Sequence, residues 1–170
     1  QWAVVEFEDH ADGKASETDL CLADALKYQR RLGELSIPSI LERSKNLNGR
    51  CYHLHVRFDE PVSARLLRDG LRAIGKQVFA DFPNEVFPKS DNGLGHFVWL
   101  PLFGGAEDTI CFKPGEPRPG GGVPSGRTIF LDGTGEIHAD QQEALIAWQS
   151  ASAKLFAETA LPLVQQVPVV

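Results

Sequence analysis

Four side chains in two short segments could carry out metal or phosphate chemistry. Glu6 and Glu8 stand two positions apart, and so do His53 and His55. Residues two apart on an extended strand point to the same side, so each pair presents its polar groups together. Two neighbouring carboxylates repel each other, and a divalent cation or a shared proton removes that repulsion. Carboxylate oxygens suit Mg²⁺ or Mn²⁺, and His-x-His is itself a common metal-ligand pair.

The histidine pair belongs to a segment, residues 51–58, in which apolar and polar residues alternate. The apolar positions predict a strand face that packs on a core. The opposite face carries Cys51, His53, His55 and Arg57. We expect this second face to be open, so that two imidazoles and a guanidinium can bind a charged ligand. A guanidinium is well suited to bidentate contact with phosphate.

A third acidic residue ends a hydrophobic strand in the second half of the chain. Alternation over residues 128–132 places Thr128, Phe130 and Asp132 on one face. If this strand lies beside the strand of Glu6 and Glu8, Asp132 completes a cluster of three carboxylates. Such a cluster can hold one or two metal ions against a nucleotide triphosphate.

Each of these residues also has an ordinary structural explanation. Glu-x-Glu on a strand is often a solvated face, and a single histidine is often packed or at the surface. Asp132 followed by Gly133 is typical of a turn. Arg57 could pair with a nearby acidic residue, and Lys89 could be a surface lysine. These alternatives stay open at the level of the sequence.

The elements that must position these residues follow from hydrophobic periodicity and from turn residues. Strands are expected over 2–8, 39–43, 51–58, 96–102 and 127–132. Helices are expected from about residue 16 to 31, from 61 to 82 and from 140 to 161, the last with Leu145, Trp148 and Leu155 on its core side. The segment 87–95 is expected to be a loop, and so is 113–126, which contains four prolines and five glycines.

This order of elements predicts an α+β fold. Helices packed on one face of a mostly antiparallel sheet give a ferredoxin-like or RRM-like plan and leave the other face for a ligand. The 170 residues are enough for a single domain with a core, and we expect residues 1–170 to be one domain. Because the chain begins at Gln1 and contains no Met, we expect it to be excised from a longer protein.

Composition narrows the classes of function. The net charge of −6 argues against extensive wrapping of nucleic acid, although it allows a local basic groove. No apolar run has the length of a membrane span. Three scattered cysteines argue against a disulfide framework, and the lack of Cys-x-x-Cys argues against a structural zinc site. We expect a cytoplasmic protein.

Three motifs, in this order, resemble those of the archaeo-eukaryotic primase superfamily, which has the Prim-Pol fold. The acidic pair is Glu6-Phe7-Glu8, the turn leading to a strand histidine is residues 48–53 (NGRCYH), and the late aspartate follows in Phe130-Leu131-Asp132. Glutamates stand where the family usually has aspartates. Further stretches are similar to primase-polymerase domains of bacterial mobile elements and conflict systems, namely 41–44, 58–62, 87–89 and 93–102.

The resemblance implies a DNA primase or polymerase that performs metal-dependent nucleotidyl transfer. It implies that Glu6, Glu8 and Asp132 hold two Mg²⁺ or Mn²⁺ ions and that His53 contacts a phosphate of the incoming nucleotide. The other nucleotide-binding residues that it implies are Asn48, Arg50, His55, Arg57, Lys89 and His96. The implied partners are a DNA template and primer, a ribo- or deoxyribonucleoside triphosphate, and a fused or associated helicase or other replication domain.

Two other classes of function stay open. The same sheet face could bind nucleotides or single-stranded nucleic acid without catalysis, as in a degenerate primase domain or an RRM. RRMs stack bases on exposed aromatic residues, and the polar face of segment 51–58 has none. A metal-dependent hydrolase built on His53, His55 and the carboxylates is the third possibility.

Overall fold

The structure is a computed structural model, and it describes residues 1–8, 20–44, 51–90 and 128–165. These residues form five strands and four helices. In chain order the elements are β1 (Trp2–Glu8), α1 (Leu20–Glu34), β2 (Ile40–Arg43), β3 (Cys51–Arg57), α2 (Ala64–Val78), β4 (Glu85–Phe87), β5 (Ile129–Leu131), α3 (Gln141–Ala147) and α4 (Ala153–Gln165). The expected strand 96–102 and the expected loop 113–126 lie outside the described residues.

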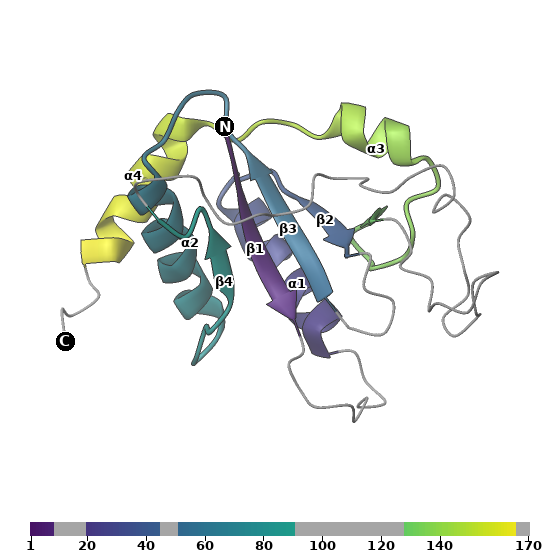
Figure 1. Cartoon of the computed structure of the whole chain (residues 1–170). Coiled ribbons are helices and arrows are strands. Elements are labelled where there is room, and N and C mark those ends of the chain that lie inside the picture. Colours follow the sequence, from purple (N-terminus) through teal and green to yellow (C-terminus); the bar gives the residue numbers. More distant parts are fainter. Residues whose placement is uncertain (9–19, 45–50, 91–127, 166–170) are drawn as a thin grey trace.

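The strands form one open sheet in the order β4-β1-β3-β2-β5 (Figure 1). Every pairing in it is antiparallel. The first six elements follow the order strand, helix, strand, strand, helix, strand, and β3 lies at the centre of the sheet between β1 and β2. This arrangement is compatible with the expected ferredoxin-like or RRM-like plan. The short strand β5 extends the sheet beyond β2.

Helix α2 shows how the sequence sets the bounds of an element. The Ser63 hydroxyl accepts a hydrogen bond from the Leu66 amide at 3.2 Å and caps the first turn. Leu67, Leu71 and Ile74 recur at helical spacing and are fully buried. The helix therefore begins after Ser63 and ends at Val78, inside the expected range of 61–82. The apolar stripe predicted for this helix is confirmed at these three positions.

The main core fills one face of the sheet, where the apolar side chains of β1 and β3 meet α1 and α2, and α4 packs on α2. Leu54, Val56 and Phe58 are buried there, as the alternation predicted. A smaller cluster of Ile40, Phe130, Ala144 and Trp148 lies on the other face. Figure 1 shows α3 near β2 and far from α2 and α4. The expectation that all helices cover one face is therefore wrong, because α3 covers part of the second.

The expected final helix is two helices in the structure. Asp140 caps α3 by accepting hydrogen bonds from the amides of residues 142 and 143, and the chain leaves the helical path at Trp148. Ala151 then pairs with Phe58 before α4 begins. This break changes the phase of the apolar pattern, so Trp148 is buried while Leu145 and Leu155 are each 37% exposed. The prediction that these two leucines face the core is wrong.

Strand β4 was not predicted, and its last residue, Phe87, lies where the expected loop 87–95 begins. Val86 and Phe87 are buried, and β4 pairs with β1 at the sheet edge. Three residues are too short a run to show alternation.

Among the described residues, none of the helices is both long and apolar enough to cross a membrane.

Candidate functional site

The pairing of three strands brings two carboxylates to either side of one imidazole. Glu6 on β1 is paired with His53 on β3, and Glu42 on β2 is paired with the same histidine. Directly paired residues share a face of the sheet. Glu8 is paired with Cys51 one step further along the same face. The first two predicted motifs therefore meet in the structure.

The contacts around His53 involve both of its ring nitrogens. Its Nε2 lies 3.4 Å from Glu6 Oε1 and 3.7 Å from Cys51 Sγ. Its Nδ1 lies 3.5 Å from Glu42 Oε2. The same Oε2 of Glu42 lies 2.9 Å from His55 Nε2, and Cys51 Sγ lies 3.4 Å from Glu6 Oε1. The result is a continuous polar cluster that crosses β1, β3 and β2.

Most of this cluster is enclosed. Glu42 and His55 are fully buried, and His53 and Cys51 are only 5% and 4% exposed. Glu6 is half-buried, while Glu8 at the end of β1 is exposed. The expectation of an open face is therefore wrong for the histidines, and the accessible part of the site is the end that carries the two glutamates.

The cluster controls the charge of its members. Burial alone would lower the pKa of His53, but its contacts with Cys51, Glu42 and Glu6 raise it well above the usual range. Burial would raise the pKa of Glu42, but the neighbouring imidazoles of His53 and His55 hold it low. The hydrogen bond from His53 also lowers the pKa of Glu6. Burial raises the pKa of Cys51, so its sulfur stays a thiol near neutral pH.

Two overlapping groups in this cluster have the residue types and spacing of metal ligands. One is Glu6, Cys51 and His53, and the other is Glu42, His53 and His55. Within each group the ligand atoms all lie within 4.8 Å of one another. Buried carboxylate, imidazole and thiol groups can bind a metal ion there, and His53 belongs to both groups.

Lys89 lies at the same end of the sheet as Glu6. Its ammonium forms an ion pair with Glu85, which is paired with Glu6 in the sheet. The charge of Lys89 also contributes to the lowered pKa of Glu6. The structure thus places this predicted phosphate-binding residue beside the acidic pair, and it adds Glu85 as a carboxylate that the sequence analysis missed.

Asp132 does not join the acidic pair. Strands β3 and β2 separate β1 from β5, and three steps of about 4.8 Å place Asp132 roughly 14 Å from the strand of Glu6 and Glu8. Its Oδ1 instead accepts hydrogen bonds from the Thr134 amide at 2.8 Å, the Thr134 hydroxyl at 2.6 Å and the Glu136 amide at 3.1 Å. The predicted three-carboxylate cluster is wrong, and the turn interpretation of Asp132 is correct.

Arg57 also serves the fold. Its Nε donates to Ser150 Oγ at 3.0 Å, one of its Nη atoms donates to the Trp148 carbonyl, and its guanidinium lies 5.2 Å from the centre of the Trp148 ring. Arg57 lies four residues along β3 from His53, about 13 Å away at the usual rise per residue. Its guanidinium is therefore engaged within the fold, and its predicted contact with a nucleotide gains no support from the structure.

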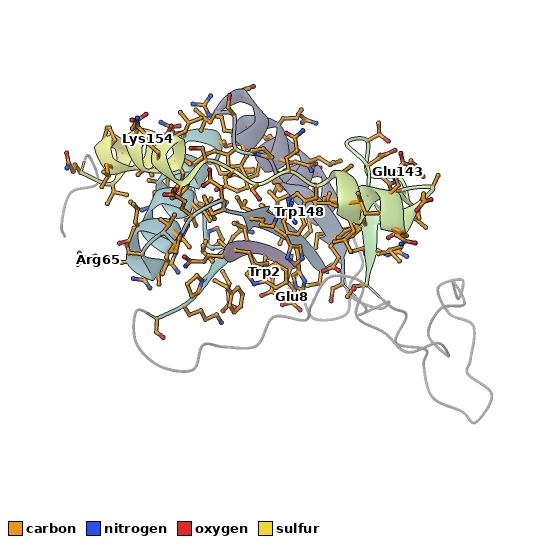
Figure 2. The ribbon with its side chains drawn as sticks, turned by 90° about the horizontal axis from the view of Figure 1, so that it is seen from above. Trp2, Glu8, Arg65, Glu143, Trp148 and Lys154 are labelled. Atoms are coloured by element: carbon orange, nitrogen blue, oxygen red, sulfur yellow. The ribbon has the colours of Figure 1, made fainter. Side chains whose placement is uncertain are left out.

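His55 is enclosed by aromatic rings. The ring centres of Trp2 and Trp148 lie 5.8 and 6.1 Å from that of His55. Figure 2 shows these two tryptophans near each other, and their ring centres lie 6.4 Å apart. With no exposed surface, His55 cannot reach a nucleotide, so its predicted role as a direct contact is also wrong. Asn48, Arg50 and His96 lie outside the described residues.

Glu42 is the main residue that the sequence analysis missed. It lies in the expected strand 39–43, and alternation there puts Ile40 and Glu42 on one face. The short connection between this strand and the histidine strand favours pairing of the two as neighbours. Together these two features could have placed Glu42 opposite the histidines.

No protein-family model matches this sequence, and no curated protein matches it. The function of the site is therefore inferred from its own residues and from the motif resemblance.

Proposed function

We propose that this domain binds nucleoside triphosphates with a divalent metal ion at the sheet end formed by Glu6 and Glu8, and that it transfers nucleotides to a nucleic-acid primer. One observation supports this most strongly. The acidic pair and the motif histidine come from distant parts of the sequence, and Glu6 and His53 are directly opposed on neighbouring strands. The resemblance implies this meeting of the first two motifs.

The acidic pair fits Mg²⁺ or Mn²⁺ through its donor atoms. Glu6 and Glu8 share a strand face, and both supply the hard oxygen ligands that these ions prefer. The low pKa of Glu6 keeps it ionised and able to bind a cation. A metal bound there would lower the pKa of an attacking 3′-hydroxyl and neutralise phosphate charge.

His53 and Lys89 provide positive charge next to these carboxylates. A triphosphate carries close to four negative charges near neutral pH. Carboxylates that face it with no cation would oppose binding by several kcal/mol at any plausible effective dielectric. Nε2 of His53 lies beside Glu6, where its N–H can donate to a phosphate oxygen. Lys89 adds a second positive charge at the same end of the sheet.

This activity defines the partners. The proposed substrates are a template strand, a primer and a ribo- or deoxyribonucleoside triphosphate, and a helicase or another replication domain would supply the single-stranded template. We place this activity in the cytoplasm of a bacterium or archaeon, or on a mobile element of such a cell.

The position of Asp132 favours a second candidate function. Without Asp132 the described site has the acidic pair but not the third carboxylate of the motif set. A domain of this kind could bind a nucleotide or a replication partner without transferring the nucleotide. Incorporation of nucleotide into a primer separates these two functions.

Primer extension with a labelled primer, Mg²⁺ or Mn²⁺, and NTPs or dNTPs tests the proposal. We expect extension by the wild type and its loss in Glu6→Gln and Glu8→Gln. Asp132→Ala is the matched control, because it removes an acidic residue that lies far from the site. Extension by the wild type that survives both glutamate substitutions would refute the assignment, and no extension under any condition would favour the binding function.

Calorimetry of nucleotide binding is a second test. Binding should require Mg²⁺ or Mn²⁺ and should be lost in EDTA, because the carboxylates then repel the triphosphate. Lys89→Ala should weaken binding in the presence of metal. Equal affinity with and without the metal would contradict the proposed site.

A further inference from the structure

We propose that Glu42, His53 and His55 form a separate metal site inside the sheet, and that it binds Zn²⁺ or a similar late transition-metal ion. The three residues come from the neighbouring strands β2 and β3. All three are buried, and their ligand atoms lie within 4.8 Å of one another. This site lies behind the acidic pair, on the β2 side of His53.

The distances fit a small metal ion. Zinc bonds to imidazole nitrogen and carboxylate oxygen at about 2.0–2.2 Å, which separates its ligand atoms from one another by roughly 3–3.5 Å. Oε2 of Glu42 lies 2.9 Å from His55 Nε2 and 3.5 Å from His53 Nδ1. A modest outward shift of the closer pair would admit an ion between the three atoms.

The hydrogen bonding of the described residues leaves a place for the ion. Nδ1 of His53 is buried and has no hydrogen-bond partner in the part of the chain that the structure describes. Its distance to Glu42 makes a contact between charged groups and not a well-formed hydrogen bond. A buried polar atom with no partner is costly. A metal ion bound to Nδ1 would satisfy it and would balance the charge of the buried Glu42.

The other nitrogen of His53 has the partner that a metal-binding histidine usually has. A ligating imidazole commonly donates its second N–H to a carboxylate, which fixes the orientation of the ring. With the ion on Nδ1, the proton of His53 lies on Nε2, which is 3.4 Å from Glu6 Oε1. The ion would therefore hold the Nε2–H toward the accessible end of the sheet. That consequence depends on the proposed function, but the metal site itself does not.

The donor set selects the class of metal. Two imidazoles and one carboxylate suit zinc and its neighbours, whereas Mg²⁺ prefers oxygen ligands alone. The lack of Cys-x-x-Cys bears only on cysteine-based zinc sites, whereas this site uses a strand His-x-His with a glutamate from the next strand. Because the tryptophan rings enclose His55, we expect the ion to enter as the chain folds.

Metal content measured after refolding tests the site. The unfolded chain is stripped with a chelator, refolded with Zn²⁺, passed through a desalting column and analysed by mass spectrometry for metals. We expect about one zinc ion per wild-type chain. Glu42→Gln and His55→Gln should each lose it. Wild-type protein that refolds with no zinc would overturn the proposal.

Two control variants separate this site from its neighbour and from general instability. Cys51→Ser should keep the zinc, because Cys51 belongs only to the group with Glu6. Tyr28→Phe should also keep it, since Tyr28 donates to the Leu71 carbonyl at 2.7 Å on the opposite face of the sheet. Loss of zinc in Cys51→Ser, with retention in Glu42→Gln, would place the ion elsewhere and overturn the proposal.

Cobalt substitution gives a readout that needs no variant and no nucleotide. Refolding with Co²⁺ should produce visible absorption bands of a cobalt site with nitrogen and oxygen ligands. A strong thiolate-to-cobalt charge-transfer band in the near ultraviolet would show that a cysteine is a ligand and would overturn the assignment. A protein that binds zinc as expected but extends no primer would leave this site intact and refute only the proposed activity.

Discussion

His53 is the residue on which both proposed sites depend. One of its nitrogens faces Glu6 and the other faces Glu42, on opposite neighbouring strands. Either a proton or a metal ion on Nδ1 supplies the positive charge that the buried Glu42 needs. In both cases the Nε2–H faces the acidic pair, so the ring can donate toward a bound phosphate.

At the same scale, Asp132 stabilises a turn. Hydrogen bonds from Thr134 lower the pKa of this exposed carboxyl below its ordinary value of 3.8. Because the pKa is lower in the folded protein than in the unfolded chain, the ionised carboxylate stabilises the fold at pH values above the unfolded pKa. This stabilisation is lost as the pH falls through the folded pKa. Asp132→Ala should therefore destabilise the protein at pH 7, and the difference from the wild type should shrink below about pH 4.

Urea denaturation of both proteins at pH 7 and pH 3 measures this effect. A difference in the free energy of unfolding that is as large at pH 3 as at pH 7 would contradict the role of the ionised carboxylate. Retention of primer extension by Asp132→Ala would agree with its distance from the acidic pair.

At the scale of elements, the contact between α2 and α4 depends on a glycine. A Cβ placed on Gly70 would lie 2.7 Å from the Ala160 Cβ and 2.9 Å from Cζ of Phe156. Gly70→Ala should therefore force the helices apart and lower the free energy of unfolding by about 1–3 kcal/mol. Thermal or urea denaturation followed by circular dichroism measures the change.

Gly33 is the matched control for this substitution. It lies in α1, and a Cβ there would meet nothing within 4 Å. Because alanine favours the helix, Gly33→Ala should leave stability unchanged or raise it by up to about 1 kcal/mol. Equal destabilisation by both substitutions would show that the contact between the helices is not the cause.

At the scale of the whole molecule, Arg57 connects the central sheet to the segment between α3 and α4. It holds Ser150 and the Trp148 carbonyl, while Ala151 pairs with the end of the same strand. Arg57→Ala should lower the free energy of unfolding by about 1–3 kcal/mol, because two acceptors lose a charged donor and the Trp148 ring loses a cation–π contact. Urea denaturation measures this change.

Nucleotide affinity distinguishes this structural role from a role in binding. Calorimetry with Mn²⁺ should give Arg57→Ala the affinity of the wild type, because the guanidinium lies far from the acidic pair. Lys89→Ala should show the opposite pattern, with weaker binding and near-normal stability. A large loss of affinity in Arg57→Ala would restore the nucleotide contact that the resemblance implied.

The local pattern of the sequence was enough to predict the faces of single strands and the core stripe of a helix. Alternation placed Leu54 and Val56 in the core, and helical spacing did the same for Leu67 and Leu71. It also put Glu6 and Glu8 on one face and His53 and His55 on one face. These results depend only on the periods of strand and helix, which neighbouring residues share.

The tertiary structure decided the full order of the strands, because that order depends on packing between segments that are distant in the sequence. It put β2 beside β3, which brought Glu42 to the histidines, and it put β5 beyond β2, which kept Asp132 away from Glu6. It also broke the last helix so that Trp148 covers His55. The sequence analysis recognised the histidines and the acidic pair but not Glu42 or Glu85, because the grouping of these residues depended on the order of the strands.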